Sequence, residues 1–478
     1  MQRSPTARAH GSCLVLASLM LAGCAHVDTG PAFQDVRGRL SERTAPTLEW
    51  AQETRPLQLE EPTLLSRDDV VRLALLHNPG LQATLEELGV SAADRVQAGR
   101  LQNPRLQAAV RPATGGGSGT NIELGLAQNL LQIFTLKARK RLAAAELEET
   151  KLRVAQSVLN LARDTDLSYL DLVAAQQKVE VCRTIRDAAA TGYELAQRFY
   201  DAGNVNELQL RREQGLVELA EVELLAAERD ATRARRALRD LLGASGDTER
   251  RWQVGSRLPD VAPETFDAAV LELQAVEERF DLQAAAQEVR TLEMALGLNR
   301  RWRLLGGLEV EASAEREVDG EWVLGPGIDI ELPLFDQGQP RVARSEARLR
   351  QAERAFEARV VEARSEVLQL VDQLDLEQRM AGRYLQHVIP LRQRTVRLAQ
   401  EQYNFMLIGV FEVLAAKRDE FDAYSSYIDT VRDVWKTRSR LRYAVGGRLA
   451  EPPFDAGQAP AKEPDTEHEH HNHSGGQR

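Results

Sequence analysis

The densest group of residues able to do chemistry lies near the C-terminus of the chain. Four histidines stand within seven residues, interleaved with Glu467 and Glu469: His468, His470, His471 and His473. Imidazole and carboxylate groups are ligands that Cu²⁺, Ni²⁺ and Zn²⁺ accept. The surrounding segment, 448–478, is rich in Pro, Gly and Glu and is expected to be disordered. The pattern therefore predicts a loose transition-metal site on a flexible tail. The alternative is a solvated tail whose metal affinity is incidental.

Cys24 is the second position with an assignable chemistry. Arg3 and Arg8 precede an apolar run of about nine residues, which is too short to span a bilayer but typical of a secretory signal. The run ends in Leu21-Ala22-Gly23-Cys24, which resembles the bacterial lipobox, and the following residue is not the Asp that would oppose transport to the outer membrane. We predict a signal peptide over 1–23 and a covalent lipid on Cys24, worth about 0.8 kcal/mol for each buried methylene. The alternative is a plain signal peptide with a chance cysteine.

The residue types that enzymes use form no catalytic pattern in the sequence. There is no HExxH, CxxC or Gly-x-Ser-x-Gly motif. Outside the signal and the tail, histidine occurs only at positions 26, 77 and 387, and Cys182 is the one remaining cysteine. We expect Cys182 to be a small packing residue. We also expect neither an enzyme nor a resident cofactor; the alternative considered is a metallohydrolase that uses the scattered histidines.

Composition favours long helices over a thick globular core. The net charge is −11, charged residues make up 28% of the chain and aromatic residues only 5%. An acidic chain without a basic patch argues against a nucleic-acid partner, and few aromatics beside many Ala, Leu, Glu and Arg residues are typical of coiled coils. No stretch after the signal approaches eighteen uncharged apolar residues, so we expect no transmembrane helix. Any part that crosses a membrane would then be β-barrel.

Two successive sets of helices divide the body of the chain. The first set is expected from Ser66 towards Pro104, over 137–200 and over 207–242. The second is expected over 265–299, over 342–403 with an interruption at Pro390, and over 411–444. The helix over 137–200 would be roughly 95 Å long at 1.5 Å per residue. We predict an internal duplication with repeats 66–243 and 265–447, joined by a linker over 244–264 and preceded by an extended, proline-containing tether over 24–65.

Four segments between the helices alternate apolar and polar residues. They lie near 104–112, 121–130, 304–315 and 322–332. About nine to eleven residues is the length of a tilted transmembrane strand, so we predict that they cross the membrane; the alternative is two soluble amphipathic hairpins. The polar faces carry six acids: Glu123, Glu309, Glu311, Glu315, Asp329 and Glu331. The same faces carry two basic residues, Arg105 and Arg111, so acids are in excess and predict a lumen that prefers cations. The alternative is that these charges only solvate the lumen.

The strand count predicts an oligomer. Four strands cannot close a barrel, because open edges have no partner in lipid and eight strands are the usual minimum. Several copies must therefore share one barrel, and the count alone allows two, three or four. The long helices agree, since each has apolar residues on two neighbouring stripes, as helices in a ring have.

The order of these features resembles the TolC-like outer-membrane efflux proteins, especially the lipidated branch that exports metals and drugs. The resemblance covers nearly everything from Ser66 to Gly447. It is carried by Leu73–Leu81, by the strand-to-helix joints ending at Phe134 and Phe335, and by the turns 198–203 and 401–406. It implies a homotrimer with a twelve-stranded β-barrel above a periplasmic α-barrel of coiled-coil helices. It also implies a periplasmic adaptor and an inner-membrane pump as partners.

The same resemblance places adaptor docking and gating at two helix turns. One turn holds Asp201, Gly203, Asn206 and Glu207, and the other holds Asn404, Met406, Gly409 and Glu412. Many relatives place glycine three residues after the aromatic residue of the turn; the first turn keeps this glycine, but Met406 replaces it in the second. The acidic residue also falls seven positions after the aromatic in one turn and nine in the other. We expect the turns to differ, although ordinary turn chemistry explains each residue equally well.

These features predict a lipid-anchored exit duct in the outer membrane of a Gram-negative bacterium. Such a duct would passively conduct substrate from a periplasmic adaptor and inner-membrane pump to the exterior. The histidine-rich tail favours heavy-metal cations as the substrate. Drug or small-molecule efflux, type I secretion and a structural lipoprotein without transport are the alternatives.

Overall fold

The computed structural model describes residues 27–41, 43, 63–112, 120–244, 252–305, 307–317, 319–450 and 454. These residues are mostly helical, which confirms the predicted fold class at that level. The chain divides into two compact units. Unit 1 comprises Met1–Arg39, Ala83–Ala155 and Asp281–Ala358; unit 2 comprises Leu40–Gln82, Gln156–Phe280 and Arg359–Arg478.

Unit 1 contains an antiparallel four-stranded sheet. Its strands follow the order β2 (Arg105–Pro112), β3 (Thr120–Asn129), β5 (Leu308–Arg316) and β6 (Trp322–Ile330). The four segments predicted as strands are therefore strands. Gly125 of β3 stands opposite Gln107 of β2 and Ser313 of β5, so one register runs across the sheet. Because side chains alternate along each strand, this register gives the sheet one apolar and one polar face.

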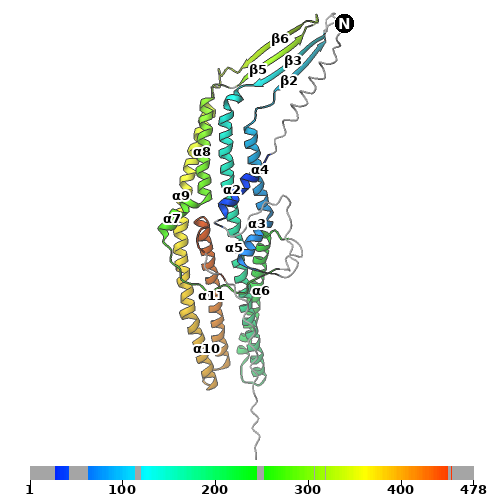
Figure 1. Cartoon of the computed structure of the whole chain (residues 1–478). Coiled ribbons are helices and arrows are strands. Elements are labelled where there is room, and N and C mark those ends of the chain that lie inside the picture. The colour runs from blue at the N-terminus through cyan, green and yellow to red at the C-terminus, as the bar shows by residue number, and fades with distance from the viewer. Residues whose placement is uncertain are drawn as a thin grey trace, which may run out of the picture. The chain divides into compact units, whose positions relative to one another are not determined.

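Helices lead into and out of both strand pairs. α4 (Pro79–Ala98) precedes β2, and α5 (Leu131–Asp201) follows β3 after a single residue. α8 (Phe280–Arg301) and α9 (Gln339–Arg383) flank the second pair, and Figure 1 shows the sheet at the end of these helices. Asn299 of α8 donates a hydrogen bond to Ser345 of α9 at 2.9 Å.

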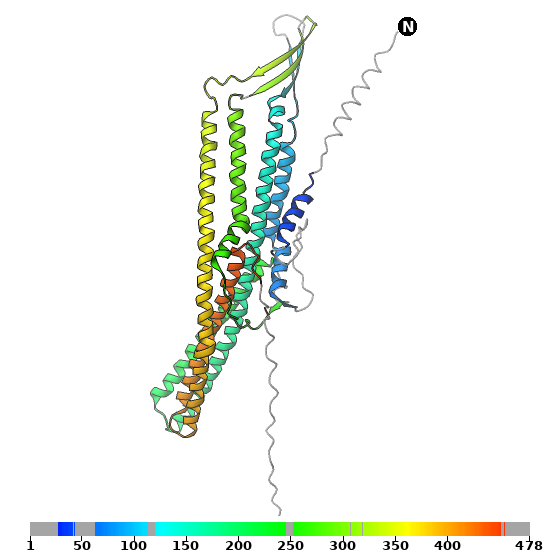
Figure 2. The same ribbon diagram turned by 60° about the vertical axis from the view of Figure 1, so that its left-hand side comes forward.

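Unit 2 is built on two long helical hairpins. The first joins the C-terminal part of α5 to α6 (Glu207–Leu241), and the second joins α10 (Ile389–Asn404) to α11 (Val410–Ala444). Figure 2 shows the turns of both hairpins at the same end of the unit. The helices predicted over 137–200, 207–242 and 411–444 are confirmed, although α5 starts earlier than expected.

Three of the predicted helices are divided in the structure. Asn78 separates α3 (Arg67–His77) from α4, since the following proline disfavours helical backbone at Asn78. Ser66 and Asp69 form a capping box at the start of α3. Arg279, in extended conformation, separates α7 (Ala268–Glu278) from α8. The interruption predicted at Pro390 is confirmed, because five π-helical residues, η2 (Tyr384–Val388), lie between α9 and α10.

A large hydrophobic core lies in unit 2 around a short parallel sheet. Its strands are β1 (Thr63–Leu65) and β4 (Trp252–Val254). A buried ion pair crosses this core: Arg67 of α3 donates two hydrogen bonds to Asp166 of α5, and Ser439 of α11 donates to the same carboxylate. The pair thus ties three helices together within unit 2.

Two segments predicted without regular structure are partly folded. Gly30–Leu40, inside the predicted extended tether 24–65, form α2, and Thr63–Leu65 form β1. The tether prediction was wrong there because Pro31 occupies the first turn of α2, where a helix needs no backbone N–H. The linker prediction over 244–264 was wrong at Trp252–Val254, since the indole of Trp252 is fully buried in the core. The remaining residues before position 63, apart from 27–41 and 43, lie outside the described part.

A closed network of four charges holds α2 in unit 1. Arg39 contacts Asp35 at 3.1 Å and Glu148 of α5 at 2.5 Å; Lys151 of α5 contacts the same carboxylates at 2.8 and 3.4 Å. Burial acts to raise the pKa of Asp35, but the hydrogen bonds from Lys151 and Arg39 lower it overall. A network of this kind fixes geometry better than an isolated surface pair.

The predicted tail 448–478 is described only at 448–450 and 454. The Phe454 ring packs against Trp435, with ring centroids 4.9 Å apart, and against Tyr169 at 6.2 Å. The prediction of disorder was therefore wrong at this residue, because its ring has an aromatic site in the core. In the described part of the chain, no helix combines the length and the apolar composition that a membrane span requires.

Candidate functional site

The turn after α5 is closed by a glycine in the left-handed region. Gly203 has φ +76°. The Asn204 N–H donates to the Phe199 carbonyl at 2.8 Å, and the Gly203 N–H donates to the Tyr200 carbonyl at 2.9 Å. This pair of bonds is the Schellman motif, which satisfies the last carbonyl groups of a helix.

The turn after α10 has the same backbone form but no glycine. Met406 has φ +57° and is the one non-glycine residue with positive φ in the described part of the chain. Its N–H donates to Tyr403 O at 2.8 Å, and the Leu407 N–H donates to Gln402 O at 2.9 Å. The departure noted in the sequence thus places a long side chain where the backbone costs it roughly 1–2 kcal/mol.

The apolar side chains around Met406 are solvent-exposed. Phe405 is 78% exposed, Met406 is 93% exposed and Leu407 is 72% exposed. The turn after α5 has no comparable group, since it reads Asp201-Ala202-Gly203-Asn204. The two turns therefore share a backbone and differ in the surface that they present.

The starts of α6 and α11 differ in how they are capped. Asn206 caps α6, and its side-chain oxygen accepts from the Gln209 N–H at 3.0 Å. Gly409 takes the equivalent place before α11 and has no side chain to cap it. Instead the Glu412 carboxylate lies over Gly409, so that a Cβ built there would stand 2.8 Å from Glu412 Oε2.

The other charged residues predicted at the first turn have partners within their own hairpin. Asp201 accepts from Gln197 at 2.9 Å, and Glu207 pairs with Arg211 at 3.3 Å. Asn404 is the last residue of α10 and is exposed. The structure therefore gathers each predicted set at its own turn, and their docking role remains a prediction.

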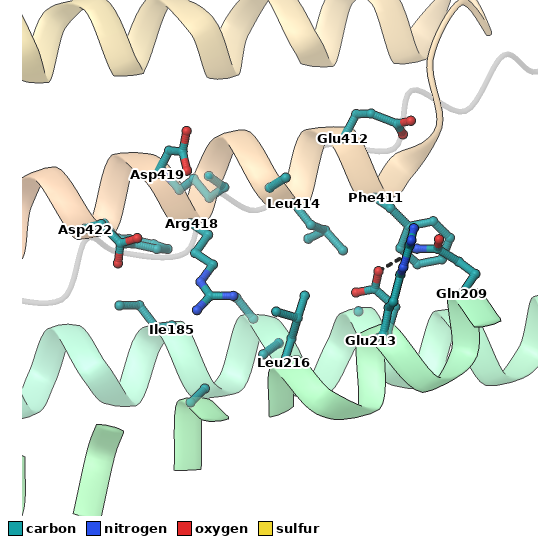
Figure 3. Close-up of a pocket in the computed structure, with 18 residues that line it drawn as sticks. Ile185, Gln209, Glu213, Leu216, Phe411, Glu412, Leu414, Arg418, Asp419 and Asp422 are labelled. Atoms are coloured by element: carbon teal, nitrogen blue, oxygen red, sulfur yellow. Dashed lines mark hydrogen bonds between the residues drawn. The ribbon is translucent and has the colours of Figure 1, made fainter. Parts of the chain in front are cut away.

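A cavity of about 600 Å³ lies between α5, α6 and α11 close to these turns. Figure 3 shows Glu213 and Leu216 reaching into it from α6, and Leu414 and Arg418 from α11. Sequence reasoning missed this site, because its residues come from three helices and follow no local motif. The one signal was Gly192, an isolated glycine inside the long helix α5.

Glu213 is a buried carboxylic acid at the wall of this cavity. Its side chain is on a residue only 7% exposed, and Gln209 donates to its Oε1 at 2.7 Å. A Cβ built on Gly192 would lie 3.7 Å from Glu213 Oε2, so the carboxyl group rests against the backbone of α5. Burial raises the pKa of Glu213, and the hydrogen bond from Gln209 opposes that rise.

A ladder of charges joins α5 to α11 farther from the turns. Lys178 pairs with Asp429 at 2.6 Å, Arg432 pairs with Asp429 at 3.0 Å, and Lys436 pairs with Asp171 at 2.7 Å. Cys182 faces the neighbouring groove of about 570 Å³ and is buried. Burial raises the pKa of its thiol, which keeps the sulfur in its unreactive protonated form.

The sheet in unit 1 gathers the predicted acids on one face. The pairing aligns Glu123 with Glu315, and Glu309 with Asp329, and it places Glu311 on the same face through Ala127. Glu331 follows β6, where its N–H donates to Gly307 O at 3.3 Å. The two predicted bases are on this face as well and form ion pairs: Arg105 with Glu309, and Arg111 with Glu123 at 3.0 Å.

The opposite face of the sheet is apolar and exposed. Leu106 is 74% exposed, Val110 66%, Leu324 77% and Ile328 69%. Exposed apolar area of this kind on a sheet face usually marks a contact with protein or lipid. The predicted alternation is therefore confirmed on both faces.

Two predicted sites cannot be placed. Cys24 lies outside the described residues, as do the four tail histidines, His468, His470, His471 and His473. In the described ranges, no three His, Cys, Asp or Glu residues come together in a group suited to a metal ion.

A family model described as outer membrane efflux protein matches residues 70–244 and 268–447. The chain belongs to this family. The two matched parts of the efflux protein cover both strand pairs and both helical hairpins.

Individual relatives agree with this assignment. The efflux protein is 25% identical over 397 residues to the cobalt-zinc-cadmium resistance protein CzcC of Cupriavidus metallidurans, which covers 80% of this chain and 90% of the relative. It is similar in structure to the outer membrane channel CmeC of Campylobacter jejuni, with a TM-score of 0.69, 14% identity and coverage of 87% and 96%. It is also similar to a membrane protein from Pseudomonas aeruginosa, with a TM-score of 0.66, 21% identity and coverage of 84% and 100%.

Proposed function

We propose that this efflux protein is one subunit of a homotrimeric exit duct in the outer membrane of a Gram-negative bacterium. The duct passively conducts substrate that a periplasmic adaptor and an inner-membrane pump deliver, and it performs no catalysis. The observation that carries the proposal is the four-stranded sheet of unit 1. It combines an exposed apolar face, an acidic face and, among the described residues, outer strands β2 and β6 that each pair on one side only.

Sharing strands between copies supplies the missing partners. In lipid, an unpaired backbone group costs several kcal/mol, so β2 of one copy would pair with β6 of the next. Three copies give twelve strands, which exceeds the usual minimum of eight. The apolar face would then meet lipid, and the acidic face would line the lumen. Each half of the internal duplication would contribute one strand hairpin to the barrel.

The helices of unit 2 carry exposed stripes that suit the same assembly. On α6, Leu208, Gly215 and Val222 recur every seven residues and are exposed. On α10 the recurring exposed residues are Leu391 and Leu398, and Phe405, the residue after the helix, continues the same spacing. Apolar positions seven residues apart are the seams of coiled coils, so a second copy of the chain is the natural cover for each stripe in a helical ring.

The proposed adaptor docks at the two turns that end the hairpins. The exposed group Phe405–Leu407 supplies an apolar contact, and the polar turn after α5 supplies a different one. A lipid on Cys24 would anchor the chain, and the charge network that fixes α2 would hold the anchored segment to unit 1.

Heavy-metal cations are the substrate that we propose. The support is the name of the relative CzcC, the excess of acids on the polar sheet face and the histidine-rich tail. Carboxylates lining a pore favour cations. Deletion of residues 463–478 should reduce tolerance to cobalt, zinc, copper or nickel in cells; unchanged tolerance to all four would remove the tail from the proposal, and sensitivity to drugs alone would favour small-molecule efflux.

The duct itself is tested in planar bilayers. Purified full-length protein should give discrete single-channel currents, and mild cross-linking should stop at the mass of three chains. Mass spectrometry of the mature N-terminal peptide should find an acylated Cys24. A protein that stays monomeric and silent, even after substitution at the turns, would instead indicate a structural lipoprotein.

A further inference from the structure

Glu213 combines burial with a position where three helices meet. Its carboxyl group rests on the α5 backbone at Gly192, and Leu414 of α11 reaches the same glycine, so that a Cβ built there would stand 2.9 Å from Leu414 Cδ1. α6 carries Glu213 itself. Separation of the two hairpins at this seam would remove α11 from the wall of the cavity and open the side of Glu213 that faces the cavity to water.

We propose that Glu213 is a proton-operated lock on the seam between the hairpins of unit 2. When it is protonated, α11 stays packed against α5 and α6; when it is ionised, the carboxylate favours separation of the seam and hydration of the cavity. This inference rests on the proposed function, because it makes the opening of the duct at its helix turns depend on pH.

The residues that face Glu213 determine whether its charge depends on its own protonation alone. From α5 it meets Gly192 and a cavity wall of alanine and isoleucine, which carries no charge. From α6 its polar contact is Gln209, with Arg212 one residue before it in the cavity wall.

From α11 the cavity wall carries five charged residues: Glu412, Lys417, Arg418, Asp419 and Asp422. Among the described residues, none of these forms an ion pair with Glu213. Two of them are paired elsewhere, Lys417 with Glu420 at 2.7 Å and Asp419 with Arg392 at 2.7 Å.

The sign of the effect follows from burial. A buried carboxyl group has a raised pKa, so the packed seam binds a proton more tightly than the separated seam. Acid therefore stabilises the packed seam, and a rise in pH through the titration of Glu213 favours separation. For a single proton the ratio of separated to packed forms changes by up to about tenfold per pH unit.

The test measures the distance between the hairpins in the full-length protein. Spin labels at Arg211 of α6 and Gln402 of α10, both exposed and neither lining the cavity nor lying on the apolar stripes, report separation in a Cys182→Ala background. The separated population should grow as pH rises from 4 to 8. Glu213→Gln should hold the packed distance throughout, whereas Glu218→Gln, an exposed acid on the same helix, should keep the response of the parent protein.

A second variant predicts a shift rather than a loss. Gln209→Met removes the hydrogen bond that favours the ionised carboxylate, so the transition should move to higher pH. A parent protein without pH response, or a Glu213→Gln variant that still responds, would overturn the lock. Conductance of the same preparations separates the two proposals. A channel that conducts, but whose pH-dependent separation is unchanged by Glu213→Gln, rejects only the lock. A protein that does not conduct, but separates with pH as expected, rejects only the duct.

Discussion

Gly192 of α5 and Leu414 of α11 are in such close contact that a side chain added at Gly192 would have to displace Leu414. A Cβ on Gly192 would lie 2.9 Å from Leu414 Cδ1, well inside van der Waals contact. Glycine inside a helix costs about 0.5–1 kcal/mol relative to alanine. The close approach of α11 explains why the long helix keeps a glycine at this position.

This contact predicts a coupled pair of substitutions. Gly192→Ala alone should change stability little, because the gain in helix propensity is offset by displacement of the Leu414 methyl group. In a Leu414→Ala background the same substitution should stabilise by about 0.5–1 kcal/mol. Urea unfolding followed by circular dichroism measures the cycle. Gly215→Ala on α6 is the control, since no atom lies within 4 Å of the added Cβ; purely additive effects of the first two substitutions would contradict the contact.

Gly203 and Met406, the residues with positive φ in the two turns, are predicted to respond in opposite ways to substitution. Gly203→Ala should destabilise the α5 turn by about 1 kcal/mol, because φ +76° is unfavourable for a residue with a Cβ. Met406→Gly should relieve the same cost in the other turn, reduced by the greater freedom of glycine in the unfolded chain. Hydrogen exchange of the amides at residues 203–204 should become faster in Gly203→Ala. Exchange of the amides at residues 406–407 should become slower in Met406→Gly. Equal effects of both substitutions would be inconsistent with the backbone geometry.

The buried pair of Arg67 and Asp166 predicts an asymmetric cost. Asp166→Ala leaves a guanidinium without its carboxylate in the core and should cost about 3–5 kcal/mol. The double variant Arg67→Met, Asp166→Leu removes both charges and should be considerably less destabilising. Thermal unfolding of the detergent-solubilised protein distinguishes the outcomes. A double variant as unstable as Asp166→Ala would indicate that shape, and not the loss of the ion pair, dominates at this site.

Tyr427 predicts a loss of stability in alkali. Burial, followed by the nearby charge of Asp260, raises the pKa of Tyr427 to about 12, and its hydroxyl donates to Asp260 at 3.3 Å. The folded form thus holds the phenol proton more tightly than the unfolded form. The stability is complete below the ordinary tyrosine pKa of about 10 and is lost as pH rises from there towards 12. Tyr427→Phe should flatten this part of the pH profile in thermal unfolding, and an unchanged alkaline slope would exclude Tyr427 as its source.

The fold could be predicted from the sequence wherever periodicity repeats over many residues. The strand around Leu124 and the helix from Glu207 each repeat their pattern over their whole length, and both were located to within a few residues. The cavity beside Glu213 could not be predicted, because its three helices meet only after folding. α2 was missed because Pro31 reads as a break in the sequence, although it is favourable in the first turn of a helix.

The polar face of the sheet predicts how the duct selects ions. Arg111 neutralises Glu123 at 3.0 Å, so Arg111→Gln would free one more carboxylate in each copy. At about 7 Å in water a unit charge contributes about 0.6 kcal/mol, attractive for a cation and repulsive for an anion, so the ratio of cation to anion permeability should rise about sevenfold. Reversal potentials under a salt gradient measure this ratio, and the increase should shrink in 1 M salt as screening shortens to about 3 Å.

Arg316 provides the matched control for this prediction. The register places it opposite Ile122, on the apolar side of the same sheet. Arg316→Gln removes the same charge without altering the acidic face, so it should leave the permeability ratio unchanged. Equal effects of Arg111→Gln and Arg316→Gln would mean that selectivity follows the net charge of the protein, and the acidic face would lose its proposed role as the lining of the pore.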